Sequence, residues 1–327
     1  MKLVEFGPDD AVHFEAFLAL TVETFAVDCP WEPPRTAYRQ RRYMEHSWEG
    51  EPGRWFVAYE GADPVGIAVI DASEYDNLEM AWFTLRVAPG SRGRGHGAEI
   101  LRALEGLAEE MGRPLLGMDG FDTAATRAFA ASAGYDLKSA EIRRMQVVED
   151  VPDPAPIRDE ALERASDYEL VRIEGYCPDD LLPALVDLTA AINDAPIDDL
   201  EWEDEVYSPE RVRAYERAQI ESGFRFRRVV ARHRRTGELA GHTVVVVDAE
   251  QPAYAEQHDT SVVRAHRGHR LGLLLKADML LWLAENEPQV ERIYTNNAES
   301  NRHMIAVNDR LGYRPMGRIL EFQRRVR

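Results

Sequence analysis

The chain has 327 residues, a formal net charge of −19 at pH 7 and a hydrophobic fraction of 45%. This length suits two domains that each bury a core, and the composition is typical of globular rather than disordered or fibrous proteins. The acidic balance argues against binding to nucleic acid or anionic lipid, which needs clustered positive charge. The apolar runs are too short for a membrane span, and two cysteines do not suggest a disulfide framework, so we expect a cytoplasmic protein.

The first half of the chain shows a defined order of strand and helix patterns. Apolar runs flank turn residues where strands are expected, and apolar residues recur at helical spacing where a helix is expected. In chain order, we expect strands at residues 54–59, 65–70 and 83–87, a Gly/Arg-rich loop at 88–97, a helix at 100–111, a strand at 114–117 and a helix at 124–133.

The second half repeats this order. We expect strands at residues 229–232, 241–247 and 260–263, a Gly/Arg/His-rich loop at 264–272, a helix at 274–283, a strand at 292–294 and a helix at 301–311. The spacing from Arg92 to Gly134 is nearly the same as the spacing from Arg267 to Gly312. A repeat over several elements indicates a duplicated domain.

A proline-rich segment separates the two halves. Pro152, Pro154 and Pro156 alternate with small or acidic residues, a pattern that is not expected inside a helix, whereas the charged stretch that follows, to about Asp167, could be helical. We therefore predict a linker at residues 151–167, an N-terminal domain at 1–150 and a C-terminal domain at 168–327.

The glycine-rich loop of each half has the chemistry of an anion site. A turn between a strand and a helix leaves backbone N–H groups without partners, and the helix adds about half a positive charge at its N-terminus. A diphosphate is a natural occupant. Gly93, Gly95 and Gly97 would let the backbone approach phosphate closely, while Arg92 and Arg94 could add charge-assisted bonds. The spacing fits neither a P-loop nor a dinucleotide-binding fold, and we predict no metal site.

At these residues the chain resembles the GNAT superfamily of acyl-CoA-dependent N-acyltransferases, in tandem. The family loop Arg/Gln-x-x-Gly-x-Gly/Ala matches residues 92–97 fully and residues 267–272 except for Arg270 at the first glycine. A later family signature is matched in part by Asn301 and the pair Gly312-Tyr313. The resemblance implies an α/β (α+β) protein with two tandem GNAT-like domains, each a mixed, mostly antiparallel twisted sheet flanked by helices.

The resemblance also implies that acetyl-CoA is the cofactor and that the loops bind its pyrophosphate. In such folds a free backbone N–H on the fourth strand, here of Val87 or Val262, polarises the thioester oxygen. The implied cofactor-binding residues are Val87, Arg92, Gly93, Arg94, Gly95, His96, Gly97, Val262, Arg267, Gly268, His269, Arg270, Leu271, Gly272 and Asn301.

Candidate catalytic residues lie on the fourth strand of the second half. Glu256 is closest to the family's glutamate position, and His258 and Asp259 follow it as further candidate bases, whereas the first half offers only Glu79. Either carboxylate could remove a proton from the acceptor amine. The tyrosine that usually protonates the thiolate is replaced by Ala130 in the first half and by Asn308 in the second, and Asn308 can donate only a hydrogen bond. We favour the second half for chemistry.

Two regions give expectations about the acceptor. Residues 194–205 contain seven acidic residues and no basic one, with Trp202 among them, so they could attract a cationic amine. A solvated acidic loop is the alternative. The matching region of the first half is basic, with Arg35, Arg39, Arg41 and Arg42, so the two clefts should not share an acceptor.

The leading hypothesis is an N-acetyltransferase. It would move an acetyl group from acetyl-CoA to a primary amine of a small molecule or peptide, by direct attack in a ternary complex. The alternative is a catalytically silent acyl-CoA-binding or regulatory protein, which the missing tyrosines and Arg270 support. We expect neither nucleic acid nor membrane as a partner, and either a monomer or a homodimer.

Overall fold

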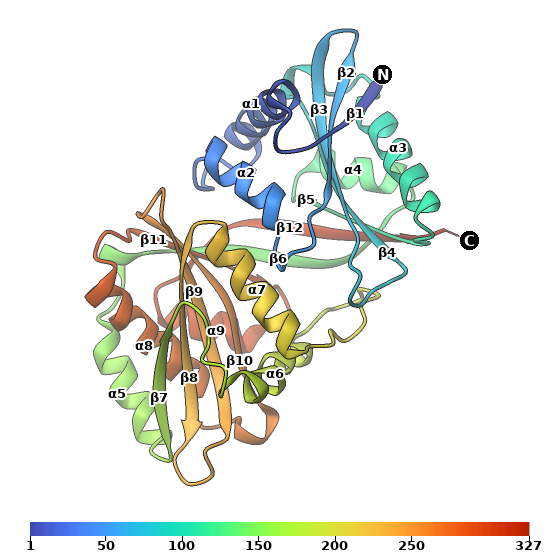
Figure 1. Ribbon diagram of the computed structural model, residues 1–327. Helices are drawn as coiled ribbons and strands as arrows, with labels where there is room; N and C mark the ends of the chain where they lie inside the picture. The colour runs from blue at the N-terminus through green and yellow to red at the C-terminus, as the bar shows by residue number, and fades with distance from the viewer. Residues whose placement is uncertain (327) are drawn as a thin grey trace. The chain divides into compact units, whose positions relative to one another are not determined.

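Two compact units, each built around a set of paired β-strands, make up the protein (Figure 1). The computed structural model describes residues 1–326. Unit 1 comprises Met1–Glu141, Ile197–Glu203 and the chain from Gly317 onward, and unit 2 comprises Ile142–Pro196 and Asp204–Met316. Helices combine with mostly antiparallel strands in both units, which confirms the predicted fold class. Within residues 1–326 we find no helix with both the length and the apolar character needed to cross a membrane.

The sheet of unit 1 has the strand order β1-β2-β3-β4-β5-β12, antiparallel throughout except for the parallel pair β4–β5. Its elements are β1 (Lys2–Phe6), α1 (Ala11–Asp28), α2 (Ala37–His46), β2 (Arg54–Glu60), β3 (Asp63–Asp71), β4 (Met80–Val87), the 3₁₀ turn η1 (Pro89–Ser91), α3 (His96–Glu110), β5 (Leu115–Phe121), α4 (Ala124–Ser132) and the first part of β6 (Asp136–Val147).

Helices cover both faces of this sheet. On one face, Phe17 of α1 and Met44 of α2 pack against Trp55 and Val57 of β2. On the other face, the α3 residues Ile100, Leu101 and Leu104 share a core with residues of β2 to β5 and β12. In Figure 1, α1 and α2 accordingly lie on one side of β2 and β3, and α3 lies on the other.

The sheet of unit 2 has the order β7-β8-β9-β10-β11-β6, with β10 and β11 parallel. Its elements are the end of β6, the 3₁₀ turn η2 (Val148–Asp150), α5 (Pro154–Arg164), β7 (Tyr168–Glu174), α6 (Leu182–Ala190), η3 (Ala191–Asp194), α7 (Pro209–Glu221), β8 (Phe224–His233), β9 (Leu239–Asp248), β10 (Tyr254–Val262), η4 (Arg264–His266), α8 (Leu271–Asn286), β11 (Arg292–Ala298), α9 (Arg302–Arg310) and the start of β12 (Arg314–Arg325).

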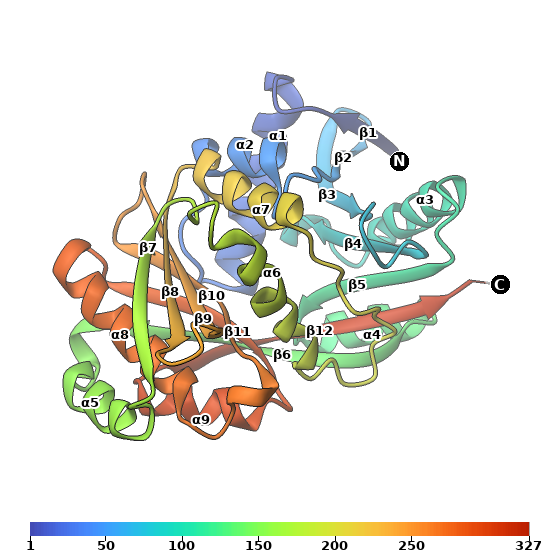
Figure 2. The same cartoon turned by 60° about the horizontal axis from the view of Figure 1, so that its bottom comes forward.

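Unit 2 also has helices on both faces of its sheet. Ala161 of α5 and Leu275 of α8 belong to the core on one face, with Val245 of β9. Leu185 of α6 and Val212 of α7 belong to the core on the other face. Figure 2 shows α5 and α8 on one side of strands β7 to β9 and α6 and α7 on the other.

The sixth strand of each sheet comes from the other half of the sequence. In unit 1, β12 pairs with β5 from Ile319 opposite Phe121 to Arg325 opposite Leu115. In unit 2, β6 lies beside β11, and the pairing region ends where the Val148 N–H donates to the Glu291 carbonyl at 2.8 Å. The units therefore do not follow the expected boundaries at residues 150 and 168, since strand patterns in a sequence do not say which sheet a strand joins.

The expected linker contains a helix. Helix α5 begins at Pro154, and Asp153 caps it by accepting a hydrogen bond from the Ala155 N–H at 2.9 Å. The expectation that these prolines exclude a helix was wrong, because the first-turn N–H groups of a helix have no partner within the helix in any case. Ala161 and Ala165 are fully buried, so this segment is part of the core of unit 2.

Candidate functional site

In unit 1, strands β4 and β5 separate part-way along their length. Their parallel pairing ends at Phe83 and Met118, whereas β4 stays paired with β3 as far as Val87. The N–H of Ala88 donates to the Val65 carbonyl at 2.9 Å, on the β3 side. Because donors alternate sides along a strand, the Val87 N–H points into the gap between β4 and β5.

A cleft of about 360 Å³ occupies this gap. Its walls come from the end of β4, the loop before α3, the first turn of α3, and α4 with the end of β5. Val87, Gly95, Gly97 and Phe129 are among the lining residues. The cleft joins the strand gap to the glycine-rich loop, as a site for an elongated ligand with an anionic end requires.

The start of α3 leaves backbone donors free for an anion. Gly95 occupies the N-cap position with φ 90° and ψ −7°, and no side chain caps this helix. Gly93 also has a positive φ, of 73°. The first-turn N–H groups therefore have no side-chain acceptor, and the helix dipole favours negative charge there. This arrangement fits the pyrophosphate of acetyl-CoA.

The loop arginines bind within the protein. The Arg92 guanidinium donates to the Val87 carbonyl at 3.1 Å and forms an ion pair with Asp28 at 2.6 Å. Arg94 donates to the Gly90 carbonyl at 3.0 Å. Both side chains brace the loop, so the anion site described above depends on backbone N–H groups rather than on these guanidiniums. The next loop residue, His96, is buried with Nε2 3.6 Å from a Glu60 carboxylate oxygen.

The loop of unit 2 follows the same plan with one change. Arg267 donates to the Val262 carbonyl at 3.0 Å and to Asp194 at 2.6 Å, and Gly268 has φ 88°. Arg270 caps α8 with φ 58° and ψ 23°, the left-handed conformation that glycine adopts in unit 1. A residue with a Cβ adopts this conformation at a cost of roughly 1–2 kcal/mol. Arg270 is also ion-paired with Glu160.

The remaining cofactor candidates of unit 2 have these surroundings. The His269 ring lies 5.5 Å from that of Tyr168, Leu271 is buried, and Gly272 lies in the first turn of α8. The Asn301 side chain caps α9 by accepting a hydrogen bond from the Met304 N–H at 3.2 Å.

The catalytic candidates of the second half are engaged in protein contacts. Glu256 is ion-paired with Arg143 of β6. Asn308 has no exposed surface and donates to the Asn297 side chain at 2.6 Å, so it cannot reach a thiolate in this structure. Asp259 lies on β10 in the irregular stretch between Gln257 and Thr260. The first-half counterpart, Glu79, is ion-paired with Arg325 at 2.7 Å.

The acidic segment also lies elsewhere than expected. Ile197–Glu203 belongs to unit 1, not to an acceptor channel of unit 2. Glu203 and Asn77 exchange two hydrogen bonds of 2.8 and 2.9 Å, and the Trp202 ring lies edge-on to that of Trp82. Asp194, at the other end of the segment, pairs with the loop arginines of unit 2. Much of the acidic charge is therefore matched within each unit.

A second cavity of unit 1, of about 150 Å³, lies on the opposite face of the sheet from α3. It is lined by residues of α1, α2 and β2 to β4, and it shares Thr84 and Arg86 with the larger cleft. These two β4 residues follow the point at which β4 and β5 separate. The two cavities thus meet at the gap in the sheet.

Asp71 is the titratable residue of this second cavity that sequence reasoning missed. Burial and the nearby carboxylate of Asp119 raise the pKa of Asp71 to about 6. Asp119 itself accepts hydrogen bonds from Trp82 and Thr84, each at 3.1 Å. A carboxyl group that ionises near neutral pH, in a cavity beside the cofactor cleft, is suited to accept a proton.

A comparison of the two halves would have singled out Asp71. Strands β9 and β10 of unit 2 correspond to β3 and β4 of unit 1. When these two strand pairs are aligned by their register, Val246 stands at the position of Asp71, and Ser261 stands at the position of Arg86. The charged residues Asp71 and Arg86 of the second cavity therefore have no charged counterpart at the same strand positions of unit 2. The sequence alone did not reveal this, because both residues lie in strands that otherwise read as structural.

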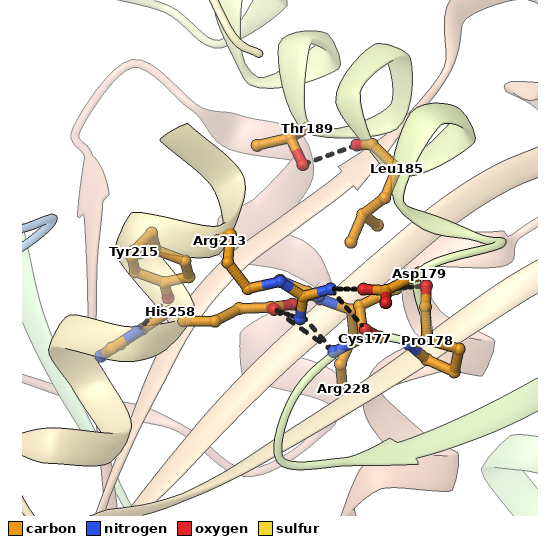
Figure 3. Close-up of polar contacts among 10 residues, drawn as sticks. Cys177, Pro178, Asp179, Leu185, Thr189, Arg213, Tyr215, Arg228 and His258 are labelled. Atoms are coloured by element: carbon orange, nitrogen blue, oxygen red, sulfur yellow. Dashed lines mark hydrogen bonds and ion pairs between the residues drawn. The ribbon is translucent and has the colours of Figure 1, made fainter. Parts of the chain in front are cut away.

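Unit 2 fills the equivalent region with buried polar contacts (Figure 3). Arg228 lies opposite Val244 in the register of β8 with β9, the same position that Trp55 has opposite Val69 in unit 1. The Arg228 guanidinium forms an ion pair with the fully buried Glu216. Arg213 contacts the same carboxylate at 2.8 Å. Burial lowers the pKa of the neighbouring His258 to about 3, so this imidazole stays neutral at physiological pH.

Comparisons with known proteins agree with this architecture. The model of the acetyltransferase (GNAT) family matches residues 18–135 and 194–313, one match in each half. A solved structure of a tandem GNAT protein from the clavulanic acid biosynthesis pathway is 26% identical, with a TM-score of 0.80, over 99% of this chain and 98% of that one. A GCN5-related N-acetyltransferase from Sphaerobacter thermophilus shares the fold at 15% identity, with a TM-score of 0.72, over 100% of this chain and 96% of that one.

No curated protein matches the chain significantly. The family model nevertheless covers most of both halves, and the sheet gap and the uncapped helix of unit 1 lie within its first match. The chain therefore belongs to the acetyltransferase (GNAT) family.

Proposed function

We propose that the protein transfers an acetyl group from acetyl-CoA to a primary amine of a small molecule or peptide, by direct attack in a ternary complex in unit 1. The observation that carries this proposal is the meeting of two cavities at the gap beside β4. One cavity ends at the anion-binding start of α3, and the other contains Asp71. We therefore place the chemistry in unit 1, although the sequence favoured the second half.

The residues that would hold acetyl-CoA are the loop and strand residues of the larger cleft. The backbone N–H groups of Gly93 to Gly97 would bind the pyrophosphate, and the N–H groups of β4 that face the gap, that of Val87 among them, would hold the pantetheine arm and the thioester oxygen. When bound, acetyl-CoA supplies a thioester at whose carbonyl carbon a C–N bond forms while the C–S bond breaks. The thiolate would take up the proton that the nitrogen gives up as the amide forms, so that coenzyme A leaves as the thiol.

Asp71 would act on the proton of the acceptor amine. An alkylamine with a pKa near 10 is neutral to only about one part in a thousand at pH 7, a handicap of roughly 4 kcal/mol. The Asp71 carboxylate can take up this proton directly or through a water molecule as the nitrogen becomes a nucleophile. Asp119, held by Trp82 and Thr84, keeps negative charge close to Asp71 and so favours this uptake.

For unit 2 we propose a role without turnover, either in stabilising the protein or in binding acyl-CoA. Its α8 start resembles that of α3 in lacking a side-chain cap. The position of Asp71 is apolar in unit 2, because Val246 stands there, and the Glu216–Arg228 ion pair occupies the acceptor side. The strand position of Asp71 is therefore without a proton acceptor in unit 2.

Matched charge changes in the two loops test this assignment. Arg94 and His269 hold the same loop position, and both side chains are exposed, so glutamate at either position should leave the fold intact. Arg94→Glu places a negative charge beside the bound pyrophosphate in unit 1. We expect at least a tenfold loss of acetyl-CoA-dependent thiol release with an amine panel, no comparable loss for Arg94→Gln, and normal release for His269→Glu.

Two outcomes would contradict the proposal. Loss of turnover in His269→Glu but not in Arg94→Glu would assign catalysis to unit 2. Absence of thiol release with every amine, from a protein that binds acetyl-CoA in a calorimetric titration, would favour the silent acyl-CoA-binding alternative.

A further inference from the structure

The second cavity of unit 1 contains opposite charges at different positions. Asp71 lies opposite Trp82 in the pairing of β3 with β4, whereas Arg86 lies opposite Ile67. This register separates the two backbone positions by about 13 Å along the strands. The side chains of Asp71 and Arg86 form no hydrogen bond or ion pair with another residue in the described range 1–326. The cavity thus offers an anionic and a cationic group that do not neutralise each other.

The cationic end of the cavity contains two arginines. The guanidinium of Arg86 lies 4.6 Å from the ring centre of Phe25, and that of Arg35 lies 4.5 Å from the same centre. Arg86 also lies 5.2 Å from the centre of the Phe121 ring. Stacking on the Phe25 and Phe121 rings holds the Arg86 guanidinium in place while its N–H groups stay available in the guanidinium plane, and those groups match a carboxylate in geometry.

Two further donors of this cavity have no partner. The side-chain nitrogens Nε2 of Gln40 and Nε1 of Trp55 are buried and make no hydrogen bond to any atom of residues 1–326. The two residues are only 9% and 7% exposed. Buried donors are normally satisfied in folded proteins, so unpartnered donors in a cavity wall indicate a ligand with oxygen acceptors.

We propose that the acceptor of unit 1 is a small amine that also carries a carboxylate, of the amino-acid or short-peptide type. Its carboxylate binds at the Arg86 and Arg35 end, and its amino group lies toward Asp71. Trp55 pairs with Val69, midway between the two ends, where its N–H can donate to a carbonyl or carboxylate oxygen of the ligand. The inference rests on the proposed function, because this amine is the one that unit 1 would acetylate.

An amine without a carboxylate would leave the cationic end uncompensated. It would gain the contact with Asp71, but the Arg86 guanidinium and the two unpartnered donors would keep no acceptor once water is displaced. The cavity should therefore prefer a free acid to the corresponding amide or decarboxylated amine by at least tenfold. The cationic acceptor without a carboxylate, which the acidic segment at residues 194–205 suggested, does not fit this cavity.

Binding of reaction products tests the ligand class without any turnover. The probes are N-acetyl amino acids, N-acetyl dipeptides and their C-terminal amides, titrated calorimetrically into the full chain with coenzyme A present. We expect the acids to bind at least tenfold more tightly than the amides. Arg86→Gln should remove this preference and Arg86→Lys should keep part of it, whereas Arg102→Gln, on the exposed face of α3, should leave it unchanged.

Equal binding of acids and amides, or no binding of either, overturns the inference, and so does a preference that survives in Arg86→Gln. The wild-type comparison alone decides the ligand class, so an unstable variant does not remove the test. Thiol release with free amino acids, dipeptides and their amides separates this inference from the proposed function. Equal turnover of acids and amides contradicts the ligand class only, whereas preferential binding of acids without any turnover supports the ligand class and contradicts acetyl transfer.

Discussion

At the scale of single residues, the carboxyl group of Asp71 links the stability of unit 1 to its activity. Its pKa is raised from 3.8 to about 6, so the folded protein holds a proton that the unfolded chain releases between these values. Stability contributed by this group is present below pH 4 and is lost as pH rises through 6. At neutral pH the buried charge costs the native state on the order of 2–3 kcal/mol.

Asp71→Asn should therefore both stabilise the protein and lower its activity. We expect a higher unfolding midpoint at pH 7.5, a difference that disappears near pH 4, and at least a tenfold lower rate of thiol release. The wild-type rate should rise with pH through about 6, and Asp71→Asn should lose this rise. Burial raises the pKa of Glu321 to about 7, so the comparison between wild type and variant identifies the group that titrates. A destabilised variant with an unchanged pH profile would contradict the role of Asp71.

Two glycines of the same helix should respond in opposite ways to alanine. Gly95 has φ 90°, a left-handed conformation that a Cβ disfavours, although no atom would crowd that Cβ. Gly106 lies in the interior of α3, equally uncrowded and without a positive φ. We expect Gly95→Ala to destabilise unit 1 by about 1 kcal/mol and Gly106→Ala to stabilise it by roughly 0.5–1 kcal/mol, measured by chemical denaturation. Equal effects of both changes would contradict this argument.

At the scale of elements, sequence periodicity was most informative where it repeated. The apolar spacing expected over residues 100–111 and 274–283 lies almost wholly inside α3 and α8, and the small-residue helix expected at 124–133 is α4 apart from its last residue. A helix was considered possible only after Pro156, and the first turn of α5 was missed because prolines were treated as breakers in every position. In α5 and α7 the prolines lie instead in the first turn, where a backbone N–H group has no partner within the helix and its absence from proline costs no hydrogen bond.

The ion pair between Glu216 of α7 and Arg228 of β8 should be essential for the stability of unit 2. Arg228→Met leaves Glu216 in the core with Arg213 as its remaining cation, which should destabilise unit 2 by about 3 kcal/mol. The double variant Arg228→Met/Glu216→Leu should recover much of this loss, because no charge then stays buried. Chemical denaturation measures both values.

The exposed ion pair of Arg232 with Glu169 provides the matched control. Arg232→Met should cost less than about 1 kcal/mol, since solvent already screens that pair. A loss for Arg228→Met no larger than that for Arg232→Met would show that the buried pair contributes little.

At the scale of the whole molecule, the last strand of the chain completes the sheet of unit 1. Leu320 and Phe322 of β12 are buried in the core beneath α3, and Phe322 also lines the cofactor cleft. Phe322→Ala should therefore destabilise unit 1 by roughly 3–5 kcal/mol and weaken acetyl-CoA binding there. Val326→Ala, at an exposed position of the same terminus, is the control. Unchanged acetyl-CoA binding in Phe322→Ala would argue against the cleft as the cofactor site.

The sequence by itself determined the duplicated α/β pattern, the family and the position of both glycine-rich loops. These features depend on local spacing along the chain, where hydrophobic periodicity and glycine positions act over one or two elements. The same local reasoning placed the chemistry on Glu256 and Asn308, whose side chains turned out to be ion-paired and buried, respectively.

Only the tertiary structure decided that two cavities of unit 1 share Thr84 and Arg86, that β6 and β12 complete the sheet of the opposite half, and that Asp71 and Arg86 line one cavity. The physical reason is that strand pairing and side-chain packing join residues far apart in sequence. A valine or an aspartate at the same strand position gives the same local pattern, but one fills a core and the other leaves a charged group in a cavity.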